Sequence, residues 1–336
     1  MVVAVTRPTR LNISQAAVTH NVQQVRESAQ ASFVFLAVKA NAYGFGLVPM
    51  SQAALAGGVD GLAVAVLDEG LALRQAGITA PILVLGITLP QYAKLLADNQ
   101  VMATVGSLAW LETAITYLKA HDDIFDYQSI MTHFSEADST EEDYFHHQLH
   151  CWHALTDGLP MPPLVHLANS GAAMYHADEM PTDVIRAGTV VYGVEPSLGE
   201  LRDDDYLEPV MTLETELVFV KRCHKGEGVS YGHTYYTEEG EWIGTVPVGY
   251  GDGIPRKMQG FEVIVNAERR PIVGKLAMDQ MMISLPGELP IGTTVTIIGR
   301  QGDVENRLED VADYAGLAPW EISTCLQERI YRQITD

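Results

Sequence analysis

The sequence predicts an α/β fold in which an N-terminal (β/α)8-type barrel is followed by a C-terminal, mostly antiparallel β domain. Apolar runs alternate with amphipathic helical segments at roughly 20- to 28-residue intervals, which is the repeat of a barrel. After Tyr206 this repeat gives way to short strands separated by turn residues. A length of 336 residues with 47% apolar content suits one large and one smaller domain. We therefore expect a barrel at residues 11–205 and a β domain formed by residues 1–10 and 206–336.

The barrel strands are expected where short apolar runs end in small or polar residues. The first run, Phe33-Val-Phe-Leu-Ala-Val38, is apolar throughout, as a strand covered by helices on both faces must be. The first helix begins at Ser14, which can cap it, and places Val18 and Val22 on one face. The expected barrel strands are residues 33–38, 61–66, 82–86, 101–105, 129–134, 164–169 and 184–189. The expected early helices are residues 14–25, 47–56, 68–77 and 108–120.

Seven barrel strands can be counted in this way, one fewer than a closed (β/α)8 barrel contains. The missing strand falls near residues 120–128, where one helix and a polar link are all that separate 101–105 from 129–134. A closed barrel tolerates little change in strand number, because tilt, stagger and diameter are linked. The wall of the barrel should therefore be altered at this point.

The β domain is expected to consist of antiparallel strands closed by two short helices. The opening residues of the chain are expected to pair with it. The expected strands are residues 211–223, 242–248, 261–265, 271–276 and 295–299, and the expected helices are residues 308–314 and 320–326.

The composition limits the partners and the compartment. With 43 acidic and 21 basic residues the formal net charge is -22, which argues against a nucleic-acid partner because phosphate binding needs positive charge. Cys151, Cys223 and Cys325 form no Cys-x-x-Cys pair, so neither a zinc site nor a disulfide is expected. No apolar run approaches the roughly 18 residues of a membrane span, and the N-terminus lacks a signal-peptide pattern. We expect no membrane association and a cytoplasmic location.

Lys39 stands at the carboxyl end of the first strand, where barrel enzymes carry out their chemistry. Its neighbours Ala37, Val38 and Ala40 are expected to desolvate the amine partly, which would lower its pKa and favour Schiff-base formation. A solvated lysine at a strand end is the simpler interpretation of this residue by itself. The motifs around it favour the chemical interpretation.

The motif Val38-Lys-Ala-Asn-Ala-Tyr-Gly-Phe-Gly46 closely resembles the signature of the alanine racemases. Further motifs that resemble this family follow in order along almost the whole chain: His166-Leu-Ala-Asn-Ser-Gly171, Arg186-Ala-Gly-Thr189, Val229-Ser-Tyr-Gly232, Gly249-Tyr-Gly-Asp-Gly253 and Ala277-Met-Asp-Gln280. The resemblance implies an isomerase that depends on pyridoxal 5'-phosphate and interconverts L- and D-alanine for peptidoglycan of the cell wall. It also implies a homodimer in which the subunits share an active site.

Racemisation needs two bases on opposite faces of the substrate α-carbon, because one proton leaves one face and another arrives at the other. The resemblance assigns these roles to Lys39, which also holds the cofactor covalently, and to Tyr231 of the other subunit, with His133 beside that tyrosine. Arg186 would bond the pyridine nitrogen, and because arginine keeps its proton that nitrogen stays unprotonated. The resemblance further implies cofactor contacts by Tyr43, His166, Asn169, Ser170, Gly188 and Thr189, substrate contacts by Met278 and Asp279, and an access corridor lined by Asp138, Tyr250 and Arg256.

The loops that hold Asn169-Ser170 and Gly188-Thr189 also point to phosphate by their chemistry. Each follows one of the last two barrel strands and opens a helix, so free backbone N–H groups face outward there. Barrel enzymes often hold phosphate between these loops.

The chain departs from the family pattern in two places. The family carries a Lys-x-Asp-Thr-Gly-Met-Gly-Arg run between the fourth and fifth strands counted here, and its arginine bonds the phenolic oxygen of the cofactor; nothing in this chain matches it. Either the sequence lacks residues that the natural protein possesses, which we favour because losing an interior strand exposes the core, or the barrel wall is rebuilt. Secondly, Trp320 stands where the family has a tyrosine that bonds the phosphate and limits substrate size.

Two other functions stay open at this point. A broader amino-acid racemase of the same fold, acting for example on serine, is favoured by Trp320. A cofactor-binding protein without racemase activity is favoured by the absent arginine segment. A metal site on His146, His150 and His153, which share one helical face, is not expected, because a polar helix surface explains them.

Overall fold

The computed structural model describes residues 2–29, 31–118, 126–180, 182–203 and 205–336. The chain divides into two compact units. The α/β unit comprises Gln15–Ala42 and Leu47–Glu208, and the β unit comprises Met1–Ser14, Tyr43–Gly46 and Pro209–Asp336.

The α/β unit alternates strands and helices, as its apolar pattern predicts. Its strands are β2 (Phe33–Ala37), β3 (Gly61–Val64), β4 (Ile82–Val84), β5 (Val101–Ala103), β6 (Ser129–Met131), β7 (Leu164–His166) and β8 (Val184–Ala187). Its helices are α1 (Gln15–Ala29), α3 (Leu47–Ala56), α4 (Leu67–Gln75), α5 (Ala93–Asp98), α6 (Leu108–Leu118), α7 (Asp143–Thr156) and α8 (Ser170–Tyr175), with 3-10 turns η1 (Pro90–Tyr92), η2 (Ala177–Glu179) and η3 (Thr189–Tyr192). The segment α2 (Lys39–Tyr43) joins the two units.

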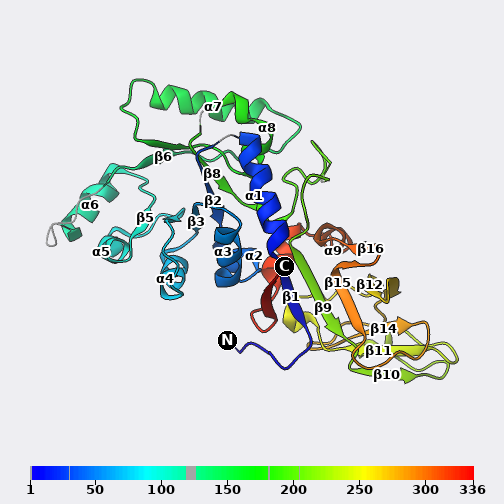
Figure 1. Ribbon diagram of the computed structural model, residues 1–336. Coiled ribbons are helices and arrows are strands. Elements are labelled where there is room, and N and C mark those ends of the chain that lie inside the picture. The colour runs from blue at the N-terminus through cyan, green and yellow to red at the C-terminus, as the bar shows by residue number, and fades with distance from the viewer. Residues whose placement is uncertain (1, 30, 119–125, 181, 204) are drawn as a thin grey trace. The chain divides into compact units, whose positions relative to one another are not determined.

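All seven strands of the α/β unit are paired in parallel. Five form a sheet in the order β5-β4-β3-β2-β8, and β6 pairs with β7 (Figure 1). Hydrogen bonds from Asp183 N to Val165 O and from Arg186 N to Ala168 O, each 2.9 Å long, connect the β7 segment to the β8 segment. This arrangement confirms the α/β fold class and, for the described residues, the count of seven barrel strands.

The barrel wall is open between β5 and β6, because within the described residues each of these strands pairs on one side only. Residues 119–125, which are the last two of the expected helix 108–120 and the first five of the expected polar link, lie outside the described residues. The barrel interior is built on Phe35, Leu83 and Val184, which are buried. The side chains packed against them are only partly buried, namely Leu85, Met102, Met131 and Leu164. A barrel interior is normally a filled core, so the open wall leaves this one less well covered.

The β unit is mostly antiparallel, as expected. Its strands are β1 (Arg10–Ser14), β9 (Met211–Glu216), β10 (Phe219–Arg222), β11 (Trp242–Val246), β12 (Glu262–Val265), β13 (Glu268–Pro271), β14 (Met281–Leu285), β15 (Thr294–Gln301), β16 (Val304–Asn306) and β17 (Tyr331–Thr335). Its helices are α9 (Leu308–Ala315) and α10 (Pro319–Cys325), with 3-10 turns η4 (Tyr231–His233) and η5 (Tyr250–Asp252).

Two sheets make up the β unit. The larger has the order β13-β12-β15-β9-β1-β17, with β16 on β15, and the smaller has the order β10-β11-β14. β1 is parallel to β17 and antiparallel to β9, so residues from both ends of the sequence share one sheet with its middle.

Some predicted strands of the β unit are wrong. The run 211–223 divides into β9 and β10, which belong to different sheets. The run 271–276 is not a continuous strand, because β13 ends at Pro271 and only an isolated bridge at Ile272 follows. The strands β14, β16 and β17 were not predicted from the sequence.

Within the β unit, the backbone of Gly44 packs closely against α10. Its φ is +85°, and a Cβ atom there would lie 1.7 Å from the backbone oxygen of Ser323 in α10. Arg332 Nε also donates to Gly44 O at 2.9 Å. Only glycine fits a positive φ at such close approach.

We predict that Gly44→Ala lowers the free energy of unfolding of the β unit by at least about 2 kcal/mol, because backbone must move to admit the methyl group. Urea unfolding followed by circular dichroism measures this. Gly287→Ala is the control, since no heavy atom lies within 4 Å of the point that its methyl group would occupy, and it should change stability by less than about 0.5 kcal/mol. Equal midpoints for the two variants would contradict the packing argument.

Candidate active site

The turn that carries Lys39 has an unusual backbone. β2 ends at Ala37, and Ala40, Asn41, Ala42 and Tyr43 follow Lys39 with φ values of 52°, 56°, 52° and 53°. Left-handed conformations place Cβ close to the following carbonyl oxygen, at a cost of roughly 1–2 kcal/mol per residue. Four such residues in succession persist only if their surroundings hold them, and such strain clusters at functional sites.

Lys39 is exposed in the structure. The expectation that its neighbours desolvate the amine is therefore wrong for this chain. Val38 is fully buried, but the left-handed turn begins directly after Lys39 and directs the chain away from the strand. The amine consequently lies at the carboxyl end of β2, open to other molecules.

The two glycine- and serine-containing loops meet, as predicted from the adjacency of the last two strands. The Gly188 N–H donates to Ser170 Oγ at 2.8 Å. Asn169 caps α8 by accepting from Ala172 N at 2.9 Å, and its amide donates to Phe134 O at 2.9 Å. Thr189 follows at the start of η3 and is half-buried. The loops form one polar surface at the carboxyl ends of β7 and β8.

Arg186 is 5% exposed and forms its hydrogen bonds with neutral groups. Its guanidinium donates to His166 O at 2.6 Å, to Thr132 O at 2.7 Å and to His133 Nδ1 at 3.4 Å. Within the described residues no carboxylate pairs with it. The bond to His166 goes to the backbone oxygen of that residue and not to Nδ1 of its ring, which has no partner among the described residues.

The imidazoles near Arg186 are held in the neutral form. Burial, and then the positive charge of Arg186, lower the pKa of His166 to about 4. The pKa of His133 is also lowered, first by desolvation and then by Arg186 and Lys39. Among the described residues, His166 Nδ1 is buried without a hydrogen-bond partner. The cluster thus offers one fixed positive charge and two neutral rings.

Several candidates lie in the β unit. Tyr43 is half-buried, and burial raises the pKa of its phenol. Tyr231 in η4 is 68% exposed, and Ser230 before it donates to Lys275 O at 2.6 Å. Met278 is exposed, and in the described part of the chain its backbone N–H has no acceptor.

The remaining candidates are exposed or partly exposed side chains. Arg256 lies over the ring of Tyr250, 5.7 Å from its centroid. Trp320 is partly exposed in α10. Asp138, in the α/β unit, lies beside Gly171 at the start of α8, and partial burial raises the pKa of its carboxyl group.

Sequence reasoning missed a charge network that holds the Met278 loop. Asp252 is fully buried and accepts from Arg7 at 2.8 Å and from Arg329 at 2.9 Å. Arg329 also pairs with Asp279 at 2.6 Å. The Gly251 N–H donates to Met278 O at 2.8 Å. Asp252 stands in the motif Gly249-Tyr-Gly-Asp-Gly253. Its two arginine partners are more than 75 positions away in the sequence, and no local pattern connects them with Asp252.

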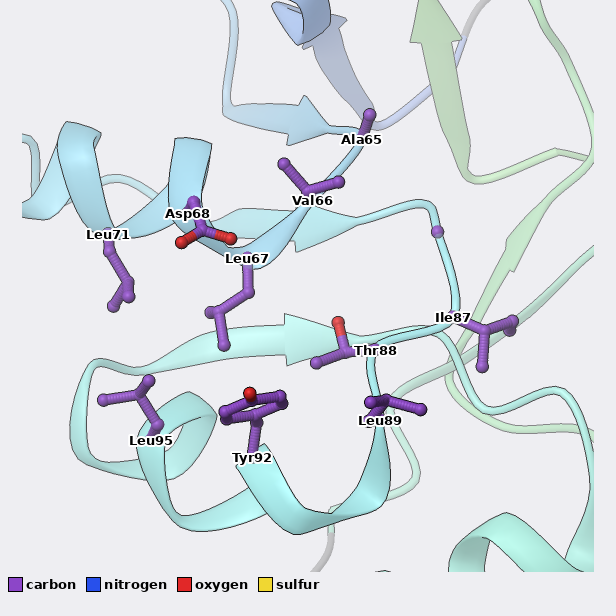
Figure 2. A pocket seen from close by; sticks show the side chains of 11 residues that line it. Ala65, Val66, Leu67, Asp68, Leu71, Ile87, Thr88, Leu89, Tyr92 and Leu95 are labelled. Atoms are coloured by element: carbon purple, nitrogen blue, oxygen red, sulfur yellow. The ribbon is translucent and has the colours of Figure 1, made fainter.

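A groove of about 320 Å³ lies beside the ends of β3 and β4. Figure 2 shows Leu67 of α4 and Tyr92 of η1 pointing toward one another across it. Its lining is mainly apolar, and it includes none of the candidate catalytic or cofactor-binding residues. No residue of the Lys39 turn is among those that line it.

The histidine-rich helix α7 makes structural contacts. His146 Nε2 lies 2.8 Å from Glu179, whose other oxygen lies 2.6 Å from His176 Nδ1. His176 stacks on Phe145 with ring centroids 3.8 Å apart. The described residues contain no group of histidine, cysteine or acidic side chains arranged to hold a metal ion.

Comparison with known proteins decides the family. The family model described as alanine racemase, N-terminal domain, matches residues 13–125 and 111–196, and the model described as alanine racemase, C-terminal domain, matches residues 210–334. The chain belongs to the alanine racemase family. It is a racemase, and thus an isomerase.

Relatives within the family differ in the substrate that their names give. A lysine racemase from Oenococcus oeni is 43% identical to this chain, and the alignment covers 100% of both proteins. An alanine racemase from Latilactobacillus sakei is 41% identical, and the alignment covers 100% of this chain and 99% of that relative. The crystal structure of alanine racemase from Oenococcus oeni matches with a TM-score of 0.92 at 41% identity over 99% of this chain and 100% of that one. A histidine racemase from Leuconostoc mesenteroides matches with a TM-score of 0.93 at 29% identity over 100% of both chains.

The family comparison also locates the shortfall in the barrel. The alignment with the lysine racemase spans 371 positions, whereas this chain has 336 residues, a difference of 35. The N-terminal family model matches in two segments that overlap at residues 111–125. The break between the two matches therefore falls between β5 and β6, where the wall of the described residues is open. Among the helices of the described residues, none has the length and apolar character of a membrane span.

We predict that acid weakens this protein in part through His166. The folded-state pKa of about 4 lies below the unfolded value of about 6.5, so the unfolded state binds more protons between these values. The contribution of the neutral His166 ring to the free energy of unfolding is fully present above about pH 6.5 and is lost as the pH falls toward 4. Urea unfolding at pH 7 and pH 5 should show a smaller loss of stability for His166→Gln than for the unsubstituted protein. His150→Gln, on the exposed face of α7, should leave the loss unchanged; equal losses in all three proteins would refute the assignment.

Proposed function

We propose that this protein is a pyridoxal 5'-phosphate-dependent racemase of alanine that supplies D-alanine for peptidoglycan and works as a cytoplasmic homodimer. The observation that carries the proposal is Arg186. A buried guanidinium held by carbonyl oxygens and an imidazole, with no carboxylate partner among the described residues, has charge available for a neutral ring acceptor. A structural arginine at this depth would normally be paired with a carboxylate.

The residues fit this cofactor on grounds of their own chemistry. The Ser170–Gly188 contact forms a polar surface with backbone N–H groups suited to a phosphate. His166 Nδ1 is a buried polar atom without a partner among the described residues, close to Arg186. Lys39, Tyr43, Asn169 and Thr189 complete the proposed set. The donor that the family uses for the phenolic oxygen is absent from this chain.

The bound cofactor supplies an electron-withdrawing ring that makes the substrate α-proton acidic. Lys39 removes or returns that proton on one face, which its exposed position at the end of β2 allows. Tyr231 of a second copy serves the other face, and its 68% exposure leaves it available to another subunit. His133, held neutral beside Arg186, can accept or donate a proton near the phenol.

Substrate binding falls to the β unit in this proposal. The N–H of Met278, which has no acceptor among the described residues, binds the substrate carboxylate, and Asp279 stands beside it, fixed by Arg329. Arg329 also pairs with the buried carboxylate of Asp252, which holds it beside the loop. Asp138, Tyr250 and Arg256 line the access corridor.

Two observations favour a broader substrate range as the second candidate. Trp320 replaces the family tyrosine, and relatives named lysine racemase and histidine racemase match the chain over its full length. A third candidate, a cofactor-binding protein without racemase activity, is favoured by the open wall between β5 and β6.

We predict that the purified protein with pyridoxal phosphate racemises L-alanine and that Lys39→Ala lowers kcat by at least about 1000-fold, because it removes both the cofactor attachment and one base. Chiral chromatography with L-alanine, L-lysine, L-histidine and L-serine measures rate and breadth. Borohydride reduction should leave the pyridoxyl label on the Lys39 peptide. Lys94→Ala, an exposed lysine paired with Asp98, is the control and should retain activity. A label on Lys39 with no racemisation of any amino acid would support the third candidate instead.

We predict that Trp320→Tyr strengthens cofactor binding about fivefold, since the family tyrosine donates its O–H to the phosphate from the tip of its ring, whereas the indole carries its single N–H on the side of a bulkier ring. The same change should raise kcat/KM for alanine relative to lysine. Spectroscopic titration with pyridoxal phosphate and competition assays measure these effects. Trp242→Tyr in β11, outside the proposed site, is the matched control; an unchanged Kd in Trp320→Tyr would remove this residue from the site.

A further inference from the structure

We propose that Glu69 is a positioning residue for Lys39, whose carboxylate holds the left-handed turn in the conformation that presents the amine. This inference rests on the proposed function of Lys39. The family resemblance gives Glu69 no role, and the sequence identifies it only as an acidic residue in the first turn of a helix.

Glu69 connects two loops through one carboxylate. Its Oε1 accepts from Ala40 N at 2.7 Å, directly after Lys39. Its Oε2 accepts from Ala65 N at 2.8 Å and from Val66 N at 3.3 Å, in the loop between β3 and α4. Figure 2 shows Ala65 and Val66 where this loop leaves β3. The Lys39 turn is thereby fixed to the start of α4.

The turn needs such an external partner. Ala40 is the first of four consecutive non-glycine residues with positive φ, a conformation in which a side chain carries a steric penalty. Further bonds hold the later part of the turn: Ala42 N donates to Val38 O at 2.9 Å, and Asn41 Oδ1 accepts from Leu47 N at 2.7 Å. The Glu69 bond is the one at the residue next to the amine.

The chemistry of the carboxylate matters as well as its reach. An ionised carboxylate accepts at both oxygens, and here both face N–H donors. A glutamine of the same size would accept at one position and present its NH2 group to a donor at the other. Glu69→Gln therefore preserves the volume of the side chain but removes the hydrogen bonding of one of its two acceptor oxygens.

The experiment compares the wild-type chain with Glu69→Gln and with Asp310→Asn. Asp310 is the matched control, because it caps α9 in the β unit by accepting from Arg307 N at 2.7 Å, whereas Glu69 belongs to the α/β unit. Hydrogen–deuterium exchange of the cofactor-free proteins reports the peptide that contains Ala40–Tyr43. Steady-state racemisation gives kcat and KM, and thermal unfolding gives stability.

In Glu69→Gln the amides of the Lys39 turn should exchange at least about tenfold faster, and kcat should fall by about 10- to 100-fold with a smaller change in KM, because a displaced amine loses near-attack geometry. Asp310→Asn should change neither. Unchanged exchange at the turn, or a loss confined to melting temperature in both variants, would overturn the proposal. If the wild-type protein racemises none of the tested amino acids, the proposed function fails, while exchange at the turn still decides whether Glu69 holds it.

Discussion

The proposed site depends on a strained connection, the four left-handed residues that follow Lys39. This conformation is costly for residues with a side chain, so the surrounding bonds must offset it. Glu69 and Asn41 supply hydrogen bonds within the α/β unit, and Gly44 packs against α10 within the β unit. The amine that the function requires is therefore placed by contacts on both sides of the turn.

Charge is organised differently in the two units. Arg186 is buried among carbonyl oxygens and neutral imidazoles, and burial together with its own charge keeps His166 and His133 unprotonated. In the β unit the buried charge is Asp252, which Arg7 and Arg329 compensate. The charge of Arg186 is not neutralised by a carboxylate among the described residues, so the proposed ligand can interact with it. The charge of Asp252 is neutralised by its two arginine partners, and Arg329 in turn pairs with Asp279 beside Met278.

In the described residues the barrel wall is open between β5 and β6. The seven described strands keep their parallel pairing, because each pair is stabilised locally by backbone hydrogen bonds and by the helices beside it. The open wall instead affects the barrel interior, where the apolar side chains of Met102 and Met131 are only partly buried.

The sequence by itself determined the fold class, the seven parallel strands and the position of Lys39 at a strand end, since apolar runs and small residues after them are local signals. It also determined that the loops of Ser170 and Gly188 meet, because adjacent parallel strands bring their carboxyl ends together. Tertiary structure alone decided the exposure of Lys39, the carbonyl partners of Arg186 and the contacts of Asp252 and Glu69. These depend on backbone dihedral angles and on contacts between residues far apart in the chain, and neither leaves a periodic pattern in the sequence.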